Sequence, residues 1–566
     1  MKYLYILVIT LAIFLRVYGL LQFPPSLYWE EAALGYDAYS ILKTGKDHHG
    51  TVLPIVAFES FGDWKPSGYF YILVPFIAAF GLTEWAVRLP TVLAGIGLLV
   101  GTALLAKRVG ISPLLVLAVG AISPWAIQFS RAGWEVMSAS ALLVWANYFF
   151  LVTLEKPKIK VKMGIAGVLF FAAAMYTYHA TRLIVPLQLL GLAIYYFSIH
   201  LRFTKITITS LLNQIVKLLN QNITQLLVPL LIFIAVIGPI LLSIGDTKTN
   251  HRFQETSIFS DLRVIEESNY LKENAGNTLL SRILYHRYIL FGREIATNFL
   301  SHFNINFLFI HGDANLRHSI QYFGQLYHIE ALFVLMGLYI WLQKRTKLHL
   351  YFLAWLFIAI IPASLTTATP HALRILPSLP IFMLLIAQGI AHFHKVLSNL
   401  IQNLLPIKPV VSSKFVALCI LLIYITEFTG FWRYYTSIYP KVASSEWQYG
   451  YKQMVTEVQR LQTENPTLPV YITREQGRPA MYYWFFSKTN PREVQAENSI
   501  VEKDQGEYLA YKNISFIDKP DQIKGPAIVV SSEKFKNQVV SVRSSVTTTQ
   551  IRDLSNTVVW DIYNVN

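Results

Sequence analysis

The sequence predicts a mainly α-helical membrane protein, a polytopic bundle of about 11–13 spans followed by a small α/β domain. Hydrophobic residues make up 54% of the 566 residues and charged residues only 14%, whereas soluble domains carry about 25% charged residues. Apolar runs about as long as a membrane-spanning helix recur through the first three quarters of the chain. From about residue 440 the composition changes to the mixture typical of a soluble α/β domain.

The candidate spans begin with an apolar segment that lacks a convincing small-residue cleavage site, so we expect an uncleaved first helix. Eight candidates lie before residue 245, but placing residues 23–68 and 245–327 on one side requires an odd number of crossings there. One short segment, such as 69–81, is therefore expected not to be a separate full span. The candidates lie at about 3–22, 69–81, 86–106, 112–129, 132–152, 163–178, 183–199, 225–244, 328–343, 348–365, 373–394 and 414–432.

The formal net charge of +15 comes from basic residues scattered between the spans. Such loops orient a membrane protein with its positive loops in the cytoplasm, and their scatter argues against nucleic-acid binding. The basic loops lie at 107–108, 155–162, 201–205 and 343–347, and residues 206–224 are expected to form a helix on the cytoplasmic surface. The single Cys419 excludes an intrachain disulfide and a thiol-rich metal site. We expect a multi-pass protein of a prokaryotic plasma or inner membrane.

Three long polar segments, 23–68, 245–327 and 440–566, are expected outside the cytoplasm. This divides the chain into a transmembrane module over 1–439 and an extracytoplasmic α/β domain over 440–566. In the latter, residues 447–465 have helical spacing, 468–473 and 526–532 resemble strands, and 477–486 is a helix or an aromatic-rich segment. No GxGxxG motif or P-loop occurs, so no nucleotide site is predicted.

Acidic residues follow the first predicted helix. Glu30 or Glu31 could act as a general base for a hydroxyl group, or the pair could open a surface helix, because acids favour helix N-termini. Asp47 lies in GKDHHG, whose adjacent histidines are a weak signal for a metal. Asp63 and Lys65 precede the next apolar run, where the lysine either anchors a helix or binds a lipid phosphate.

Further charged residues stand at the ends of spans. Glu84 and Arg88, four residues apart, are expected to form an ion pair on one helix. Others either face a cavity or cap helix ends, because ionisable groups are costly within a membrane. An arginine suits a bidentate phosphate contact. These other residues are Arg131, Glu135, His179, Arg182, His371 and Arg374.

In order, these motifs resemble glycosyltransferase family 39, which includes dolichyl-phosphate-mannose protein mannosyltransferases and the lipid A aminoarabinose transferase and has the GT-C fold. The shared order is an acidic pair after the first helix, GxDxxG, KP before the next span, GxxExxxRLP and RxxPxxP. The resemblance is clearest over 20–190 and extends to about 380, and 304–332 looks like the second large external loop of bacterial members.

The resemblance implies an inverting transfer of a sugar from a polyprenyl monophosphate to an acceptor hydroxyl of a protein, lipid or glycan. The family usually has Asp-Glu where this chain has Glu30-Glu31, so its general base falls on Glu30, with Glu31 supporting the loop or the acceptor site. Lys65 and Arg374 are expected to converge on the donor phosphate. The remaining substrate-binding candidates are Arg131, Arg182, Asp47, Asp63, Glu135, His179 and His371.

No cofactor and no metal are expected. In the aminoarabinose transferase a glutamate before the KP lysine helps to hold a metal, and here that position is Trp64. Two other classes remain open. A transporter would gather its polar residues near the bilayer midplane, and a polysaccharide polymerase or ligase would use similar lipid-linked donors.

Overall fold

The computed structural model describes residues 2–154, 160–201, 208–246, 255–498, 500–540 and 545–565. The predicted basic loops at 155–162 and 201–205 lie largely outside these residues. The chain forms two compact units. The helical unit comprises Met1–Arg16, Leu93–Ser130 and Glu135–Phe431, and the mixed unit comprises Val17–Val92, Arg131–Trp134 and Trp432–Asn566.

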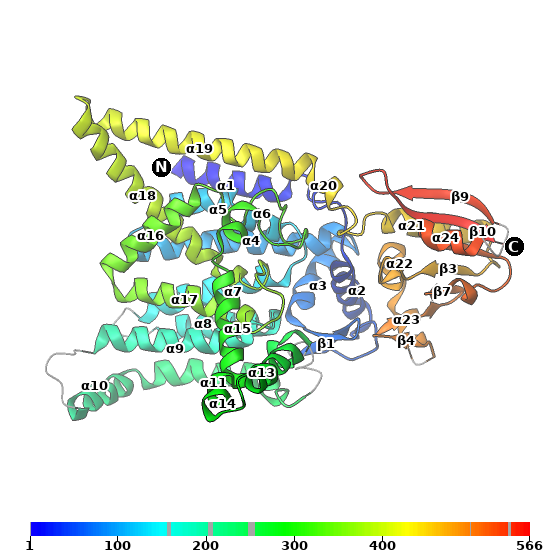
Figure 1. Cartoon of the computed structure of the whole chain (residues 1–566), viewed down its shortest axis with the longest axis horizontal. Helices are drawn as coiled ribbons and strands as arrows, with labels where there is room; N and C mark the ends of the chain where they lie inside the picture. The colour runs from blue at the N-terminus through cyan, green and yellow to red at the C-terminus, as the bar shows by residue number, and fades with distance from the viewer. Residues whose placement is uncertain are drawn as a thin grey trace. The chain divides into compact units, whose positions relative to one another are not determined.

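Within the described residues, seven helices are long and apolar enough to cross a membrane, or eight if one bent pair counts as a span (Figure 1). The apolar runs are confirmed as helices, which makes the chain a multi-pass membrane protein. The long helices are α4 (Glu84–Ala106), α7 (Glu135–Leu154), α9 (Thr181–His200), α11 (Ile223–Leu242), α17 (Lys347–Ser364), α18 (Leu379–Leu404) and α19 (Pro409–Ser437).

Shorter apolar helices accompany the long ones. They are α1 (Lys2–Val17), α3 (Gly68–Phe80), α8 (Val161–Thr177) and α16 (Glu330–Lys344). With 13 residues, α3 extends about 20 Å and is too short for a hydrocarbon core of about 30 Å, as expected for segment 69–81. Further helices of the helical unit are α10 (Ile208–Gln221), α13 (Leu262–Asn274), α14 (Leu279–Leu284), α15 (Arg287–Ser301), the 3₁₀ helices η2 (Ile258–Ser260) and η4 (Leu376–Ser378) and the π-helix η3 (Asn306–Ile310).

The predicted span 112–129 is two helices rather than one. Helices α5 (Pro113–Ile122) and α6 (Pro124–Ser130) meet at 65°, because Pro124 has no N–H to continue the helical ladder. The fully buried Arg16 compensates for this break. Its guanidinium donates to the carbonyl oxygens of Gly120 at 3.1 Å and Ala121 at 3.2 Å, and to Ser130 Oγ at 3.2 Å.

Two glycines let α16 and α18 approach closely. A Cβ at Gly337 would lie 2.1 Å from the Leu385 carbonyl oxygen, and one at Gly389 would lie 1.9 Å from that of Phe333. Small residues at helix interfaces are typical of membrane bundles, in which tight packing drives association. The helical unit is therefore held in part by direct backbone contact between these helices.

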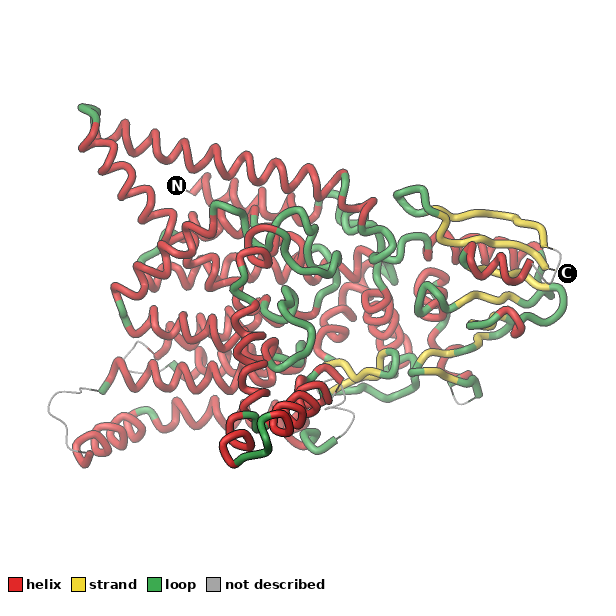
Figure 2. Tube along the Cα trace, in the orientation of Figure 1, coloured by secondary structure: helices red, strands yellow, loops and turns green. Residues whose placement is uncertain are grey.

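All described strands belong to the mixed unit (Figure 2). A six-stranded sheet has the order β6 (Ala510–Tyr511), β7 (Ile514–Ile517), β3 (Val470–Thr473), β8 (Ala527–Ser531), β10 (Val558–Val565) and β9 (Ser545–Arg552). Strand β3 runs parallel to β7 and β8, with Val470 opposite both Ile514 and Ile528. The remaining pairs are antiparallel. The C-terminal region also contains helices α20 (Tyr439–Val442), α21 (Tyr451–Glu464), α22 (Pro479–Ser487), α23 (Pro491–Glu497) and α24 (Glu533–Val540), the 3₁₀ helix η5 (Pro520–Gln522) and the hairpin of β4 (Lys503–Asp504) and β5 (Glu507–Tyr508).

The mixed unit joins the first polar segment to the C-terminal region. The first segment supplies α2 (Trp29–Thr44) and hairpin β1 (Ala57–Ser60)–β2 (Asp63–Pro66). One hydrophobic core contains side chains from α2, α3, α21, α22 and the sheet. Gly35 of α2 leaves room for Phe485 of α22, and the hydroxyl of Tyr36 donates to the Thr489 carbonyl oxygen at 3.0 Å. The first polar segment and the C-terminal region therefore fold as one body.

Candidate active site

The acidic pair opens helix α2, and its two members have different surroundings. Glu31 is fully buried, and its carboxylate accepts four hydrogen bonds. Arg88 Nε donates at 3.0 Å and Arg88 Nη2 at 3.1 Å, and the backbone N–H groups of Gly133 and Tyr28 donate at 2.7 and 3.2 Å. Such a bidentate, saturated contact fixes the start of the helix.

Arg88 also holds the chain that leads into α2. Its Nη1 donates to the carbonyl oxygens of Leu20 at 2.8 Å and Pro24 at 2.9 Å, and Nη2 donates to that of Ser26. The predicted ion pair between Glu84 and Arg88 is wrong. Arg88 pairs with Glu31, and Glu84 pairs with Lys452 at 2.7 Å, because the fold offers each residue a partner distant in sequence that the helical spacing does not reveal.

Glu30 occupies the more open position of the pair. Its side chain is 23% exposed, and its Oε1 lies 2.7 Å from the ammonium of Lys65. The hydroxyl of Tyr28 donates to Oε2 at 2.6 Å. Lys65 itself is nearly buried on β2, where Phe58 of β1 pairs with it. The site therefore places a carboxylate and an ammonium side by side.

Aromatic and amide groups contact Tyr28 and Trp29, the residues just before Glu30. The ring of Tyr28 lies 4.9 Å from that of Trp134 and 5.9 Å from that of Trp447 between centroids. Gln448 Oε1 accepts from the Trp29 N–H at 3.0 Å. No sequence motif singles out Trp134, Trp447 or Gln448, and only the density of aromatic residues near 28–29, 134 and 447 could have pointed to them.

Arg131 and Asp63 also lie in the mixed unit. Arg131 is fully buried, donates to the carbonyl oxygens of Phe23 at 2.9 Å and Tyr18 at 2.8 Å, and lies over the Phe23 ring at 4.7 Å. These contacts brace the turn before α2. Asp63 is the first residue of β2, and its Oδ1 accepts from the Trp64 N–H at 2.8 Å. Substrate binding by either residue stays a prediction.

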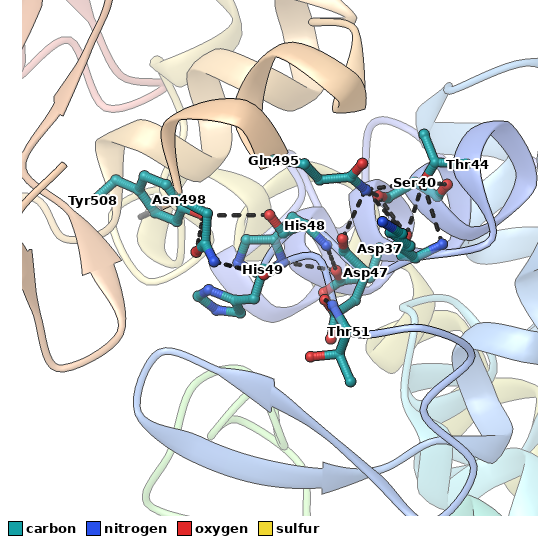
Figure 3. A network of polar contacts seen from close by, with 11 residues as sticks. Asp37, Ser40, Thr44, Asp47, His48, His49, Thr51, Gln495, Asn498 and Tyr508 are labelled. Carbon is teal, nitrogen blue, oxygen red and sulfur yellow. Dashed lines mark hydrogen bonds and ion pairs between the residues drawn. The ribbon is translucent and has the colours of Figure 1, made fainter. Parts of the chain in front are cut away.

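Asp47 belongs to a buried polar network around the GKDHHG motif (Figure 3). Its Oδ1 accepts from the Thr51 N–H at 2.8 Å, while Asp37 Oδ1 contacts His48 Nδ1 at 2.6 Å. The side-chain amide of Gln495 donates to the Asp47 carbonyl oxygen at 2.9 Å, and that of Asn498 donates to the His49 carbonyl oxygen at 2.7 Å. The network ties this loop to the C-terminal region.

Burial perturbs the titration of this network. It raises the pKa of Asp47 from 3.8 to about 6, and the charge of Asp37 adds to the rise. Burial alone would lower the pKa of His48, but the adjacent Asp37 carboxylate raises it. Burial and the charge of His48 lower the pKa of His49 to about 2. The arrangement favours a protonated Asp47 and a protonated His48 in mildly acidic solution.

The other predicted site residues belong to the helical unit. Glu135 begins α7, and His179 precedes α9. Arg182, in the first turn of α9, donates through Nε to the Met175 carbonyl oxygen at 3.4 Å. Arg374 donates to Thr366 Oγ1 and to the Ala368 carbonyl oxygen, the latter at 3.2 Å. Substrate contacts of these residues, and the convergence of Lys65 with Arg374, stay predictions.

His371 lies in a cluster that sequence analysis did not find. Its Nδ1 is 3.9 Å from Asp313 Oδ2, and His318 Nδ1 is 3.3 Å from the same oxygen. Burial would raise the pKa of Asp313, but the hydrogen bond and charge of His318 lower it. Asp313 and His318 lie in the segment that resembles the second external loop of the family. The only sequence feature that could have indicated the cluster is the stretch HGDANLRH at 311–318.

The helices and the mixed sheet make the chain a multi-pass membrane protein with an additional α/β region. Solved structures with the same arrangement identify the fold more closely. No family model and no curated protein matches the chain by sequence. ArnT from Cupriavidus metallidurans bound to undecaprenyl phosphate matches with TM-score 0.52 and 12% identity, over 99% of this chain and 97% of that chain. The chain therefore has the GT-C fold found in this transferase.

Two further structures match at lower scores. ArnT from the same organism in the apo state has TM-score 0.49 and 12% identity, over 94% of this chain and 93% of that chain. The archaeal oligosaccharyltransferase AglB from Archaeoglobus fulgidus, in complex with an inhibitory peptide and a dolichol-phosphate, has TM-score 0.47 and 12% identity, over 86% of this chain and 63% of that chain. At such scores neither adds an argument about this chain.

Proposed function

We propose that this protein is a membrane glycosyltransferase that moves a sugar from a polyprenyl monophosphate to an acceptor hydroxyl. The observation that carries the proposal is the pairing of Glu30 with Lys65 at 2.7 Å, with the hydroxyl of Tyr28 donating to the second oxygen of Glu30 at 2.6 Å. A carboxylate supplies a proton acceptor, and an ammonium beside it supplies charge for a phosphate. The likeness in fold to an ArnT bound to undecaprenyl phosphate supports the lipid-linked donor.

In the proposed reaction, the acceptor hydroxyl gives its proton to the Glu30 carboxylate while its oxygen forms a bond to the anomeric carbon. The bond from that carbon to the phosphate oxygen breaks, and its electron pair leaves with the polyprenyl phosphate. Attack from the opposite face inverts the anomeric centre. The leaving phosphate monoester needs nearby positive charge rather than a proton, which is the role proposed for Lys65.

The ion pair suggests how the donor would prepare the base. A donor phosphate that approaches Lys65 competes with Glu30 for the ammonium. Glu30 would then keep the hydrogen bond from Tyr28 at 2.6 Å and turn an oxygen toward the acceptor. Glu31 is unsuited to this task, because it is fully buried and its oxygens already accept four hydrogen bonds. Its role is to position the helix that carries Glu30.

The proposed location of this chemistry is the outer face of a prokaryotic plasma or inner membrane. Residues 23–68 and the C-terminal region share one hydrophobic core, so they must lie on the same side. The distribution of basic loops favours the outer side for both.

The decisive experiment uses the purified full-length protein in lipid nanodiscs with a panel of polyprenyl-phosphate sugars and simple acceptor alcohols. Release of polyprenyl phosphate that depends on both donor and acceptor supports the proposal. Transport of an intact lipid-linked sugar into sealed vesicles, without cleavage of any donor in the panel, would instead support a transporter.

A further inference from the structure

The helical unit brings together three potential metal ligands from two segments. Asp313 and His318 follow η3, and His371 precedes η4. Their side chains are 6%, 6% and 18% exposed, respectively. One ligand atom from each residue lies within 4.8 Å of the other two. Two imidazole nitrogens and one carboxylate oxygen form a donor set that suits zinc and related divalent transition metals.

The distances between these atoms are close to those that a bound ion requires. Zinc–nitrogen bonds of about 2.0–2.1 Å in a tetrahedral site place two ligand atoms about 3.3 Å apart. Asp313 Oδ2 lies 3.3 Å from His318 Nδ1 and 3.9 Å from His371 Nδ1. Small side-chain rotations that draw His371 inward would complete the set of three ligands.

Outer contacts already orient the ligands. The N–H of Asn315 donates to Asp313 Oδ1 at 2.8 Å, and the N–H of Ala372 donates to Asp313 Oδ2 at 2.7 Å. The His318 ring stacks on Phe129 with centroids 5.9 Å apart. Ligands of metal sites are usually held by such outer contacts.

One atom of the cluster has no other role among the described residues. His371 Nδ1 is buried and has no hydrogen-bond partner there, and its 3.9 Å separation from Asp313 exceeds a hydrogen bond. A buried polar atom without a partner is uncommon in a folded protein. A simple hydrogen-bonded Asp313–His318 pair would leave this nitrogen unsatisfied, whereas a shared cation would satisfy it.

We propose that Asp313, His318 and His371 bind one Zn²⁺ ion, with a fourth position open to water or an anion. The ion would fasten the loop after η3 to the chain that enters α18. The site differs from the sequence-based expectation of no metal. The steps of the proposed transfer use Glu30 and Lys65 and none of these three ligands, although His371 is also one of the substrate-binding candidates predicted from the sequence.

The test uses the untagged full-length protein in nanodiscs, stripped with a chelator and titrated with ZnCl₂. Metal content by mass spectrometry and the thermal unfolding temperature are the two readouts. We expect one Zn²⁺ per chain and a higher unfolding temperature with Zn²⁺, because a ligand that binds only the folded state stabilises it. Asp313→Asn and His371→Ala should weaken binding by more than about 100-fold, beyond the 10–100-fold typical of changing an outer contact.

His311→Ala is the matched control, because His311 is an exposed histidine in the same segment. It should bind Zn²⁺ as the parent does. Unfolding temperatures of the metal-free variants identify any that fail to fold, and Asp313→Asn keeps the shape of the side chain if His371→Ala is unstable. A metal-stripped parent that regains no stoichiometric Zn²⁺, or folded Asp313→Asn and His371→Ala proteins with parental affinity, would overturn the proposal.

Discussion

The substitution Glu30→Gln tests the proposed role of Glu30 as a general base while changing the size of the side chain very little. Glutamine keeps the size of the side chain, and its carbonyl oxygen can still accept the hydrogen bond that Tyr28 donates at 2.6 Å. It cannot accept the proton of an acceptor hydroxyl. Loss of a general base typically costs about 10²–10⁴ in rate, which corresponds to about 3–5 kcal/mol in activation free energy. We therefore expect turnover to fall by this factor while the donor still binds.

The same change also removes the partner of Lys65. Because the Glu30 side chain is 23% exposed, we expect a loss of about 1–2 kcal/mol in unfolding free energy, between the values for surface and buried pairs. Thermal unfolding of the variant defines a temperature at which it is folded, and rates are compared there. Glu30→Asp keeps the charge that the resembled family places here, so it should retain partial or greater activity.

The assay measures release of polyprenyl phosphate from a matched donor by thin-layer chromatography at saturating acceptor. Glu31→Gln is the contrast, because it breaks a fully buried ion pair with Arg88. It should lower the unfolding free energy by about 3–5 kcal/mol, so its main defect should be in folding. A folded Glu30→Gln protein with near-parental turnover would refute the role of Glu30 as the base.

The remaining predictions concern the donor, the pH dependence and the topology. Lys65→Gln and Arg374→Ala should each weaken donor binding by about 1.5–3 kcal/mol, the value of one charge-assisted contact, and unchanged affinity in equilibrium binding would exclude the residue concerned. Since burial raises the pKa of Asp47 from 3.8 to about 6, the folded state holds this proton more tightly and its stability should fall by about 3 kcal/mol as pH rises from about 4 to 6. Asp47→Asn should remove this component of a pH series of unfolding temperatures, and an unchanged series would contradict it. Protease should cleave residues 440–566 in right-side-out vesicles, and cleavage only in inverted vesicles would place them in the cytoplasm.

Much of the helical architecture could be predicted, because a membrane-spanning helix is a continuous run of apolar residues that can be recognised within its own segment. Strands β3 and β8 could be predicted for a similar reason. Their sequences, VYIT and AIVVS, are short apolar runs, and all of their residues are buried in the sheet. The union of α2 with α22 could not be predicted. Their contact joins Gly35 to Phe485, and no pattern in a single sequence pairs residues so far apart.

The candidate site likewise contains residues that local motifs predict and residues whose partners lie far away in the sequence. The order of motifs pointed to Glu30 and Lys65, and the structure pairs them. The local rule for residues four apart on a helix gave a wrong partner for Arg88, because Arg88 pairs with the buried carboxylate of Glu31 on α2 and the half-buried Glu84 pairs with Lys452. Asp313 and His318 went unselected because the third member of their cluster, His371, lies on a distant segment.

The difference between two adjacent acids explains why both are present. Consecutive residues on an α-helix point about 100° apart, so one carboxylate can enter the core while the next faces the more open side. Glu31 uses this geometry to bind Arg88 and the N–H groups that fix the start of α2. The Glu30 side chain, 23% exposed, therefore lies beside Lys65 and does not take part in the buried contacts that fix the start of α2. The proposed general base needs such a support, because a substrate must be able to displace the contacts that its carboxylate makes.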